Sequence, residues 1–197
     1  GNISTSMYVP KQLPNGGQKP SSSPIKTFYT YDKSSASKVP SDLPVSIVYP
    51  TYTKKIFYDD LFRVTRTTII ADDSEPVSEN FSYDGVGNML THRDVENNLT
   101  QYFYDKRNRL VQQIDAIGGV TKYKFDNRDN LITVTDPHNQ ITRYVYDRAN
   151  RLTQVTKPLG QTTVYVYDPN GNRTYIYDSK GQKIVHTYDL ANRRTNT

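Results

Sequence analysis

The chain of 197 residues carries 25 Lys and Arg against 20 Asp and Glu, a net charge of +5, and only 35% hydrophobic residues, of which 17 tyrosines supply a large part. So few aliphatic side chains exclude a dense two-layer core, and the absence of cysteine excludes disulfides and thiol chemistry. The length allows one domain, and no stretch is apolar enough for direct membrane insertion.

Residues 1–24 differ from the rest of the chain because they are dense in Pro, Gly and Ser. Pro10, Pro14, Gly16 and Gly17 interrupt any regular element. Such a composition is typical of an extended or flexible segment. We expect an N-terminal arm that either lies extended on the rest of the protein or forms a flexible lead-in.

Residues 25–83 contain two short β-rich stretches that each end in an aromatic residue followed by Asp, namely Thr27 to Asp32 and Ile56 to Asp59. The next such pair lies 25 residues after Asp59, four more than the spacing later in the chain. We expect this surplus in the acidic loop 72–76. This part of the chain is predicted to hold degenerate repeat units with longer loops.

From residue 84 to residue 197 the aromatic-Asp pair recurs every 21 residues without insertion or deletion. Such regularity indicates a repeat array, and it argues against a single independent active site. The pairs form the repeat signature: Tyr83-Asp84, Tyr104-Asp105, Phe125-Asp126, Tyr146-Asp147, Tyr167-Asp168 and Tyr188-Asp189.

Each repeat is predicted to hold two turns. Three residues after the Asp of the pair stands Gly, Asn or Asp, the residue types that tolerate positive φ, and the same pattern returns ten residues later. The Asp side chain can accept a backbone N–H two residues on, which gives the turn a mechanism. In the second turns the left-handed residues include Gly118, Gly160 and Gly181.

Between the turns lie two segments of strand length, which together make one β-hairpin. The second segment has the pattern Thr-x-Tyr-x-aromatic, as in Thr121 to Phe125, so alternate residues share one face of a pleated strand. Tyr suits a sheet that is wet on both sides, because its ring buries area while its hydroxyl stays hydrated. The fold predicted is all-β, an antiparallel meander of 21-residue β-hairpin repeats that forms a curved sheet.

The array stops at Thr197, inside the unit that Asp189 opens. An array cut within a unit leaves an exposed strand edge. We therefore expect the chain to be part of a larger polypeptide.

The repeat resembles the YD repeat of the Rhs family, over residues 84–197 and in weaker form over 27–83. The residues that carry the resemblance are Tyr104-Asp105, Arg109-Leu110, Asp115, Gly118, Thr121, Tyr123 and Phe125. Relatives with this repeat are bacterial Rhs polymorphic toxins, wall-associated toxins, Tc toxin B and C subunits and animal teneurins.

The resemblance implies that the curved sheet is part of a hollow Rhs-type β shell that encloses a C-terminal toxic domain until delivery. The partners implied are the remainder of its own shell, the enclosed toxin domain, and a secretion apparatus or a toxin translocation subunit. The protein would be secreted or lie at the bacterial cell surface, with export signals outside this segment.

Bacterial Rhs shells usually close with a segment that contains Asp-Pro-x-Gly and is linked to self-cleavage. Asp168-Pro169-Asn170-Gly171 fits this pattern superficially. It stands in register with the ordinary turns, lacks the following Leu and is continued by another repeat. We expect no cleavage here.

We expect no enzymatic activity, no cofactor and no metal. The Asp residues recur because turns need them, whereas a catalytic pair of acids would occur once. Calcium-binding β-rolls, which Asp near Gly can suggest, use much shorter and Gly-dense units. His92, His138 and His186 fall at different repeat positions, so we expect them to face solvent or pack on the sheet.

Interleaved Tyr and Arg in a basic chain can indicate a nucleic-acid surface. Arg109 and Arg151, however, share a turn-flanking position that Asn130 and Asn172 fill elsewhere, so stacking on Tyr or pairing with Asp explains them. We expect no nucleic-acid partner. A positive inner wall that holds an acidic cargo is a further hypothesis, which basic side chains dispersed over the outer face would contradict.

Two functions from different classes remain. The first is structural, a shell segment that encapsulates and sequesters a toxic domain. The alternative is a cell-surface adhesive or carbohydrate-binding module, because exposed tyrosine rows can stack on sugar rings. Tyr123, Tyr144 and Tyr165 discriminate between them: inside a closed or layered wall they exclude sugar binding, and in an open groove they favour it.

Overall fold

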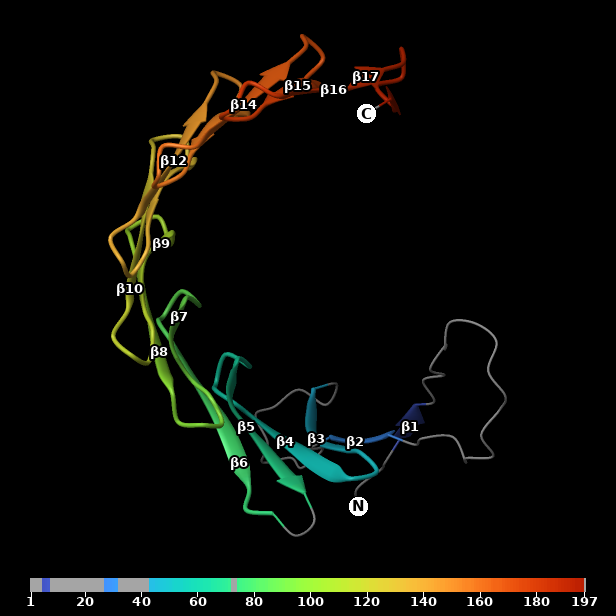
Figure 1. Cartoon of the computed structure of the whole chain (residues 1–197). Helices are drawn as coiled ribbons and strands as arrows, with labels where there is room; N and C mark the ends of the chain where they lie inside the picture. Colours follow the sequence, from blue (N-terminus) through green and yellow to red (C-terminus); the bar gives the residue numbers. More distant parts are fainter. Residues whose placement is uncertain (1–4, 8–26, 32–42, 72–73, 197) are drawn as a thin grey trace. The chain divides into compact units, whose positions relative to one another are not determined.

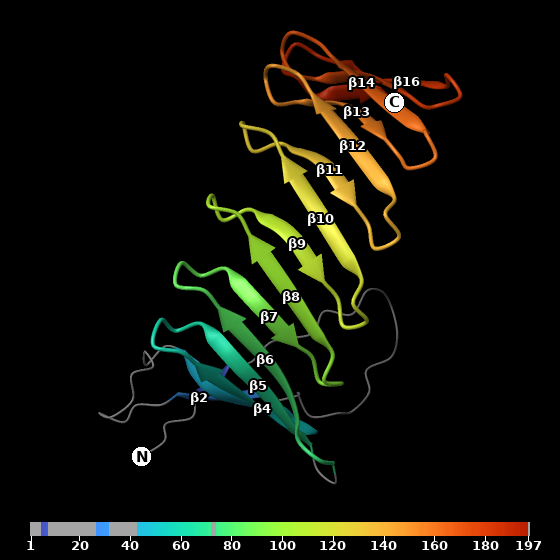
Figure 2. The same cartoon turned by 90° about the vertical axis from the view of Figure 1, so that its left-hand side faces the viewer.

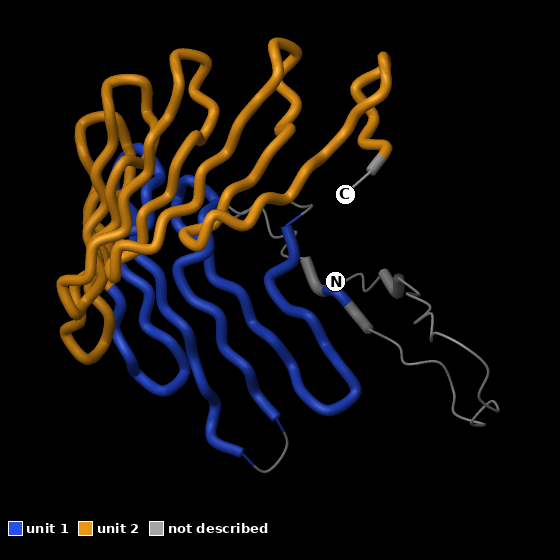
Figure 3. The backbone as a smooth tube through the Cα atoms, turned by 45° about the horizontal axis from the view of Figure 1, so that its top comes forward, with its two compact units in different colours: residues 1–100 blue, residues 101–197 orange. Residues whose placement is uncertain are grey.

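The computed structural model describes residues 5–7, 27–31, 43–71 and 74–196. Contacts divide the chain into two compact units, residues 1–100 and 101–197 (Figure 3). The predicted boundaries after residues 24 and 83 stay predictions, and the N-terminal arm lies outside the described residues except for Thr5–Met7. Among the described residues no helix has the length and apolarity needed to cross a membrane.

The first unit is an antiparallel meander in which each strand pairs with the next along the chain. The stretches ending at Tyr31 and Tyr58 are strands, as the two degenerate units predict. The strands are β1 (Thr5–Met7), β2 (Thr27–Tyr31), β3 (Pro44–Val48), β4 (Tyr52–Tyr58), β5 (Val64–Ala71), β6 (Val77–Tyr83) and β7 (Met89–Arg93).

The four extra residues between Asp59 and the next aromatic-Asp pair lie in the strands and not in the acidic loop. The prediction that placed them in the loop is wrong. The stretch 72–76 between β5 and β6 is as long as the loop 94–98 of the next unit. β5 and β6 have 8 and 7 residues, against 5 and 6 in β9 and β10. The run Thr67 to Ile70 is β-branched throughout, which favours a longer strand, and its end pairs with β4.

The second unit is also an antiparallel meander, in more regular form, which confirms the predicted fold class (Figure 2). Its first strand, β8, begins two residues before the unit boundary. The strands are β8 (Leu99–Tyr104), β9 (Leu110–Ile114), β10 (Val120–Phe125), β11 (Leu131–Thr135), β12 (Ile141–Tyr146), β13 (Leu152–Thr156), β14 (Thr162–Tyr167), β15 (Arg173–Tyr177) and β16 (Lys183–Val185), followed by the hairpin of β17 (Thr187–Tyr188) and β18 (Arg194–Asn196).

The pleat gives the sheet of the second unit two unlike faces. On β10, Thr121, Tyr123 and Phe125 are half-buried, whereas Lys122 and Lys124 are exposed. Cross-strand register carries this difference from strand to strand. We call the side with Tyr102, Tyr123, Tyr144 and Tyr165 the tyrosine face, and the side with Lys122, Lys124 and Arg143 the lysine face.

The described residues contain no buried hydrophobic side chain. Of the side chains that the structure describes, only Thr67 and His186 are nearly enclosed, at 7% and 6% exposure. A one-layer sheet of this kind draws its stability from contacts between neighbouring strands and units, as in other repeat proteins. The small share of aliphatic residues in the sequence thus agrees with a one-layer sheet in which the described residues form no buried core.

Each regular repeat contains one β-bulge, which no sequence pattern predicted. The register slips immediately before the last aromatic residue of the strand, as between Lys124 and Phe125 or between Val145 and Tyr146. A bulge bends its strand and increases the local twist. One bulge per repeat therefore accounts for the bend of the second unit's sheet, which Figure 1 shows from β9 to β16.

The second turns have the predicted left-handed residues, among them Gly118 with φ 83° and Gly160 with φ 80°. In most of them an Asp accepts backbone N–H groups: Asp115 Oδ1 lies 3.1 Å from the nitrogen of Ile117 and 2.7 Å from that of Gly119. Lys157 stands at this position in one unit. That turn keeps its backbone hydrogen bonds without an Asp acceptor, with the Lys157 nitrogen 2.8 Å from the Gln161 oxygen.

Lys157→Asp is expected to raise the free energy of unfolding by about 1 kcal/mol, because the new carboxylate accepts the N–H groups of Leu159 and Gln161. Urea unfolding followed by circular dichroism measures the change. Lys157→Ala is the control, since it removes the cation without adding an acceptor. Equal gains from both variants would assign the effect to the lost positive charge and contradict the turn mechanism.

Candidate functional site

The aspartate turns are the five-residue turns that each begin at the Asp of an aromatic-Asp pair. In an antiparallel meander alternate connections fall at the same end of the strands, so within each unit the aspartate turns form one row. Their fourth residues have positive φ, as predicted, including Asn108 at 60°, Asp129 at 67° and Asn150 at 59°. The row in the second unit begins at Asp105 and runs to Asp189.

Asp105 shows how the carboxylate builds its turn. Its Oδ1 accepts the N–H groups of Arg107 at 2.8 Å and Arg109 at 3.1 Å. Its Oδ2 accepts Nε of Arg109 at 2.8 Å and Nη2 at 2.6 Å. The acceptor capacity of the carboxylate is therefore used within its own turn.

These hydrogen bonds stabilise the ionised carboxylate. The side chain of Arg109 is the main cause that lowers the pKa of Asp105 below its usual value, and the side chain of Asn130 lowers the pKa of Asp126. At Asp147 the main cause of the lowered pKa is the backbone N–H of Arg151. A catalytic acid needs a raised pKa, so these carboxylates are suited to structure and not to proton donation.

The residue four positions after the Asp alternates strictly between Arg and Asn. Both types reach back to their own carboxylate: Arg151 Nε lies 2.7 Å from Asp147 Oδ2, and Asn130 Nδ2 lies 2.9 Å from Asp126 Oδ2. The alternation doubles the period of the array at this one position. The residues in chain order are Arg63, Asn88, Arg109, Asn130, Arg151, Asn172 and Arg193.

An Arg at this position also reaches forward to the next turn. Nη1 of Arg109 donates to the backbone oxygen of Asp126 at 3.1 Å and to Oδ1 of Asp129 at 2.7 Å. Its guanidinium carbon lies 4.8 Å from the centre of the Phe125 ring. Arg151 repeats the arrangement with the backbone oxygen of Asp168. Arg63, Arg109 and Arg151 therefore each bind two turns together and cover the aromatic residue of the signature.

An Asn at this position makes a different junction with the next turn. Asn130 Nδ2 lies 3.0 Å from Asn150 Oδ1, and Asn172 Nδ2 lies 2.8 Å from Asn192 Oδ1. The fourth residue of the following turn is thus Asn after an Asn, whereas it is Asp129 or Gly after an Arg. Residue types on successive turns are matched in pairs.

Arg109→Asn is expected to lower the melting temperature by about 3–6 °C, because the shorter side chain loses its contacts with the next turn and with Phe125. The double variant Arg109→Asn with Asp129→Asn rebuilds the Asn–Asn junction and is expected to regain part of the loss. Asp129→Asn alone serves as the third corner of the cycle. Strictly additive changes in the melting temperature would contradict the pairing.

The tyrosines of the aromatic-Asp pairs hydrogen-bond to the backbone of the preceding strand. The hydroxyl of Tyr146 donates to the backbone oxygen of Leu131 at 3.1 Å, and that of Tyr167 to the oxygen of Leu152 at 2.8 Å. Tyr83 and Tyr188 make the same bond to residues 64 and 173. In the unit that ends at Phe125 no hydroxyl is present to make it.

Phe125→Tyr is expected to stabilise the chain by about 1 kcal/mol, because the added hydroxyl can donate to the oxygen of Leu110 as its counterparts do. Tyr146→Phe is the reverse control and should cost a similar amount. Chemical denaturation of both variants measures the two changes. A loss of stability in Phe125→Tyr would show that the ring under Arg109 has no room for the hydroxyl.

The three histidines have separate surroundings. His92 stacks on Phe81 with the ring centres 4.8 Å apart, and His138 is exposed in a second turn. His186 takes the repeat position of Tyr144 and Tyr165 and is the most enclosed side chain among the described residues. Within the described part of the chain no three His, Asp or Glu side chains are placed to hold a metal ion.

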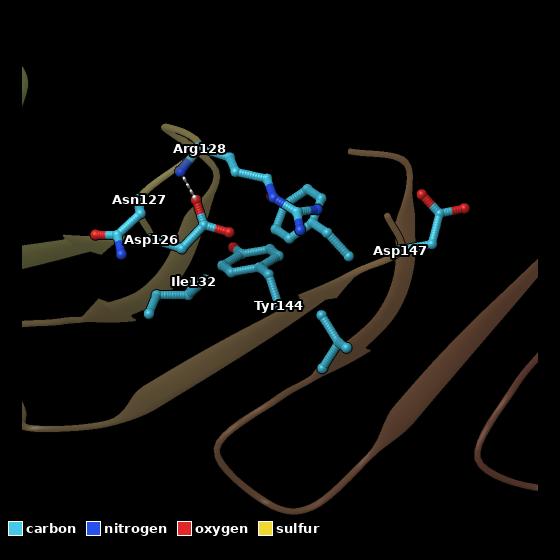
Figure 4. A pocket seen from close by; sticks show the side chains of 8 residues that line it. Asp126, Asn127, Arg128, Ile132, Tyr144 and Asp147 are labelled. Carbon is cyan, nitrogen blue, oxygen red and sulfur yellow. Dashed lines mark hydrogen bonds between the residues drawn. The ribbon is translucent and has the colours of Figure 1, made fainter. Parts of the chain in front are cut away.

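An open pocket of about 460 Å³ lies beside the tyrosine of one repeat (Figure 4). Asp126, Asn127 and Arg128 come from an aspartate turn, Ile132 from the bulge of β11, and Tyr144 from β12. Asp147, at the start of the next turn, also lines it. Of the three tyrosines chosen to discriminate between the two functions, Tyr144 thus lines an open cavity.

Three overlapping stretches of the chain, residues 104–141, 125–162 and 146–182, match the family model of the RHS repeat. Residues 104–182 therefore contain RHS repeats. Each matched stretch begins at the aromatic residue of a signature pair, so the starts of the matches follow the 21-residue period of the sheet. A search of the curated proteins found no match.

The fold of the chain is also seen in solved structures. A crystal structure of TcdB2-TccC3 matches with a TM-score of 0.73 at 15% identity, over 98% of this chain and 12% of that chain. A crystal structure of TcdB2-TccC3-Cdc42 gives the same values. The Photorhabdus luminescens Tc holotoxin pore matches with a TM-score of 0.65 at 16% identity and the same coverage. At this identity the likeness shows the fold, and the chain spans 12% of the length of those chains.

Proposed function

We propose that this chain is a structural segment of a shell that encloses and sequesters a toxic domain before delivery. The observation that carries the proposal is the likeness of 98% of the chain to part of TcdB2-TccC3. The match to the RHS repeat and the one-layer sheet support it, because a wall needs a large extended surface and no core of its own.

The proposed role is structural and not enzymatic. The carboxylates of the aspartate turns are engaged by their own turns, and their pKa values are lowered, which supports a scaffold. The proposed partners are the rest of the shell, the enclosed domain, and a secretion apparatus or translocation subunit, with no nucleic acid. The proposed location is outside the cell or at its surface, with export signals beyond this segment.

The test uses the natural polypeptide that contains this segment. Mass spectrometry identifies its other parts, and limited proteolysis follows each of them in the intact protein. A segment outside the repeats should resist cleavage until urea opens the sheet, and then be cut quickly. Cleavage of every such segment at the same rate before and after opening of the sheet would overturn the proposal.

The pocket at Tyr144 favours a second candidate function, carbohydrate binding. A tyrosine ring flanked by carboxylates and an Arg is suited to stack on and hydrogen-bond a sugar, and the volume lies in the range of small-molecule sites. Saturation-transfer NMR with glucose, galactose and their dimers should show contacts that vanish in Tyr144→Ala and persist in Tyr102→Ala. No transfer to any of these sugars would remove this candidate.

A further inference from the structure

Charge is distributed unevenly between the turns and the strands of the second unit. Every Asp of residues 101–197 lies in a turn, and this stretch has no Glu. The strands β8 to β18 therefore contain cationic side chains but no carboxylate. In most of the turns Asp supplies the hydrogen-bond acceptor, whereas nothing in the strand pattern calls for Lys or Arg. The strand cations need an explanation of their own.

Three of these cations gather on the lysine face. Lys124 pairs with Thr133 across β10 and β11, and Thr133 pairs with Arg143 on β12, so the two cations lie on one face two strands apart. Lys122 lies two residues before Lys124 on the same strand and face. All three side chains are exposed, and none has an ion pair among the described residues.

The same face exposes apolar side chains beside the cations. Phe103, Val145 and Val166 are 43%, 48% and 37% exposed. Val145 lies two residues from Arg143 on β12 and shares its face. Exposed apolar area marks interaction surfaces, and cations free of neighbouring acids complement a partner of opposite charge.

We propose that the lysine face of the second unit binds an acidic protein surface that also carries apolar side chains. Lys122, Lys124 and Arg143 supply the charge complementarity, and Phe103 and Val145 supply apolar contact area. The identification of that surface with the enclosed domain rests on the proposed function. The preference of the lysine face for an acidic chain does not rest on the proposed function.

The surroundings of the cations favour a protein over a nucleic acid. Nucleic-acid surfaces interleave cations with aromatic rings on which the bases stack. The residues paired with Lys122, Lys124 and Arg143 are Thr and Gln. Lys183 covers Tyr175 and Tyr177 further along this face, with its Nζ 3.9 Å from the centre of the Tyr175 ring. Phe103 is then the exposed aromatic ring near these cations, and a single ring gives bases little to stack on.

The test measures fluorescence anisotropy of a labelled acidic peptide of alternating Glu and Leu with the 197-residue chain. The variant Lys122→Gln, Lys124→Gln, Arg143→Gln is compared with Lys106→Gln, Arg148→Gln, Lys180→Gln, which removes the same charge from exposed turns. We expect the face variant to weaken binding about tenfold and the turn variant less than about threefold. Thermal melting checks that both triple variants are folded. If the face variant is unfolded, the single variant Arg143→Gln takes its place.

Two results would overturn the proposal. Equal weakening by the two triple variants would show attraction by net charge without a defined face. Tighter binding of a labelled oligothymidylate than of the peptide, lost in the face variant, would assign the face to nucleic acid. Neither result depends on enclosure of a domain, which the proteolysis of the natural polypeptide tests separately.

Discussion

Asp105→Ala is expected to lower the melting temperature of the chain by about 5–10 °C, more than any other single side-chain truncation in the row of aspartate turns. The substitution removes the acceptor for the N–H groups of Arg107 and Arg109 and for two nitrogens of the Arg109 guanidinium. A turn that loses its acceptors leaves these donors to water or unpaired. Differential scanning calorimetry measures the shift.

The loss should spread beyond the turn, because Arg109 also holds the next turn and covers Phe125. Hydrogen exchange is therefore expected to quicken in β9 and β10 before it does in β15. Asp115→Ala is the matched control, since Asp115 accepts two backbone N–H groups in a second turn. If Asp105→Ala and Asp115→Ala cost the same, the link through Arg109 adds nothing to stability.

Asp105→Asn separates the two functions of the carboxylate. An Asn oxygen can still accept the N–H groups of the turn, whereas the charge that pairs with Arg109 is lost. We expect an intermediate melting temperature. A value equal to that of the unchanged chain would mean that the backbone acceptor, and not the ion pair, carries the turn.

The repeat architecture could be predicted from the sequence because its signals are local. Asp and a left-handed residue three positions later define a turn within one stretch of chain, and the positive φ values of Asn108 and Gly118 follow from that pattern. The strand between them shows its face through the alternation of Thr, Tyr and an aromatic residue. Each of these statements needs no knowledge of a distant residue.

The features that were missed depend on neighbouring units meeting in a particular register. The hydrogen bond from the Tyr146 hydroxyl to the Leu131 oxygen joins residues 15 apart in the chain. Asn130 contacts Asn150 only because successive turns lie in one row. The alternation of Arg and Asn is visible in the sequence, but its meaning requires that row. The bulge before Phe125 leaves no mark in residue type, since the strand pattern continues through it.

The prediction that placed the four extra residues of the longer unit in the acidic loop failed for a physical reason as well. An acidic stretch with Pro suggests a loop, and residues 72–76 do connect two strands. The extra length was nevertheless encoded in the β-branched run Thr67 to Ile70, where strand propensity is high. The hairpin of β5 and β6 is thus longer in its strands, while its connection keeps the length of the one in the next unit.

Acid is expected to unfold the chain through the same carboxylates. In the described part of the chain, eight Asp residues have a pKa below the usual value of 3.8: Asp59, Asp84, Asp94, Asp105, Asp126, Asp147, Asp168 and Asp189. A lowered pKa in the folded chain means that the unfolded chain binds more protons as the pH falls. The stabilisation is thus complete above the unfolded value and is lost as the pH drops through the folded values.

We expect the melting temperature to change little from pH 7 to pH 5 and to fall by more than about 10 °C between pH 5 and pH 3. The main causes of the lowered pKa values are hydrogen bonds from residues such as Asn88 and Arg109, which act at contact distance. About 1 M salt, with a Debye length of about 3 Å, should therefore leave most of the loss in place. If salt restored the melting temperature at pH 3, repulsion among the positive charges of the protonated chain would be the cause, and the aspartate turns would not be the acid-sensitive element.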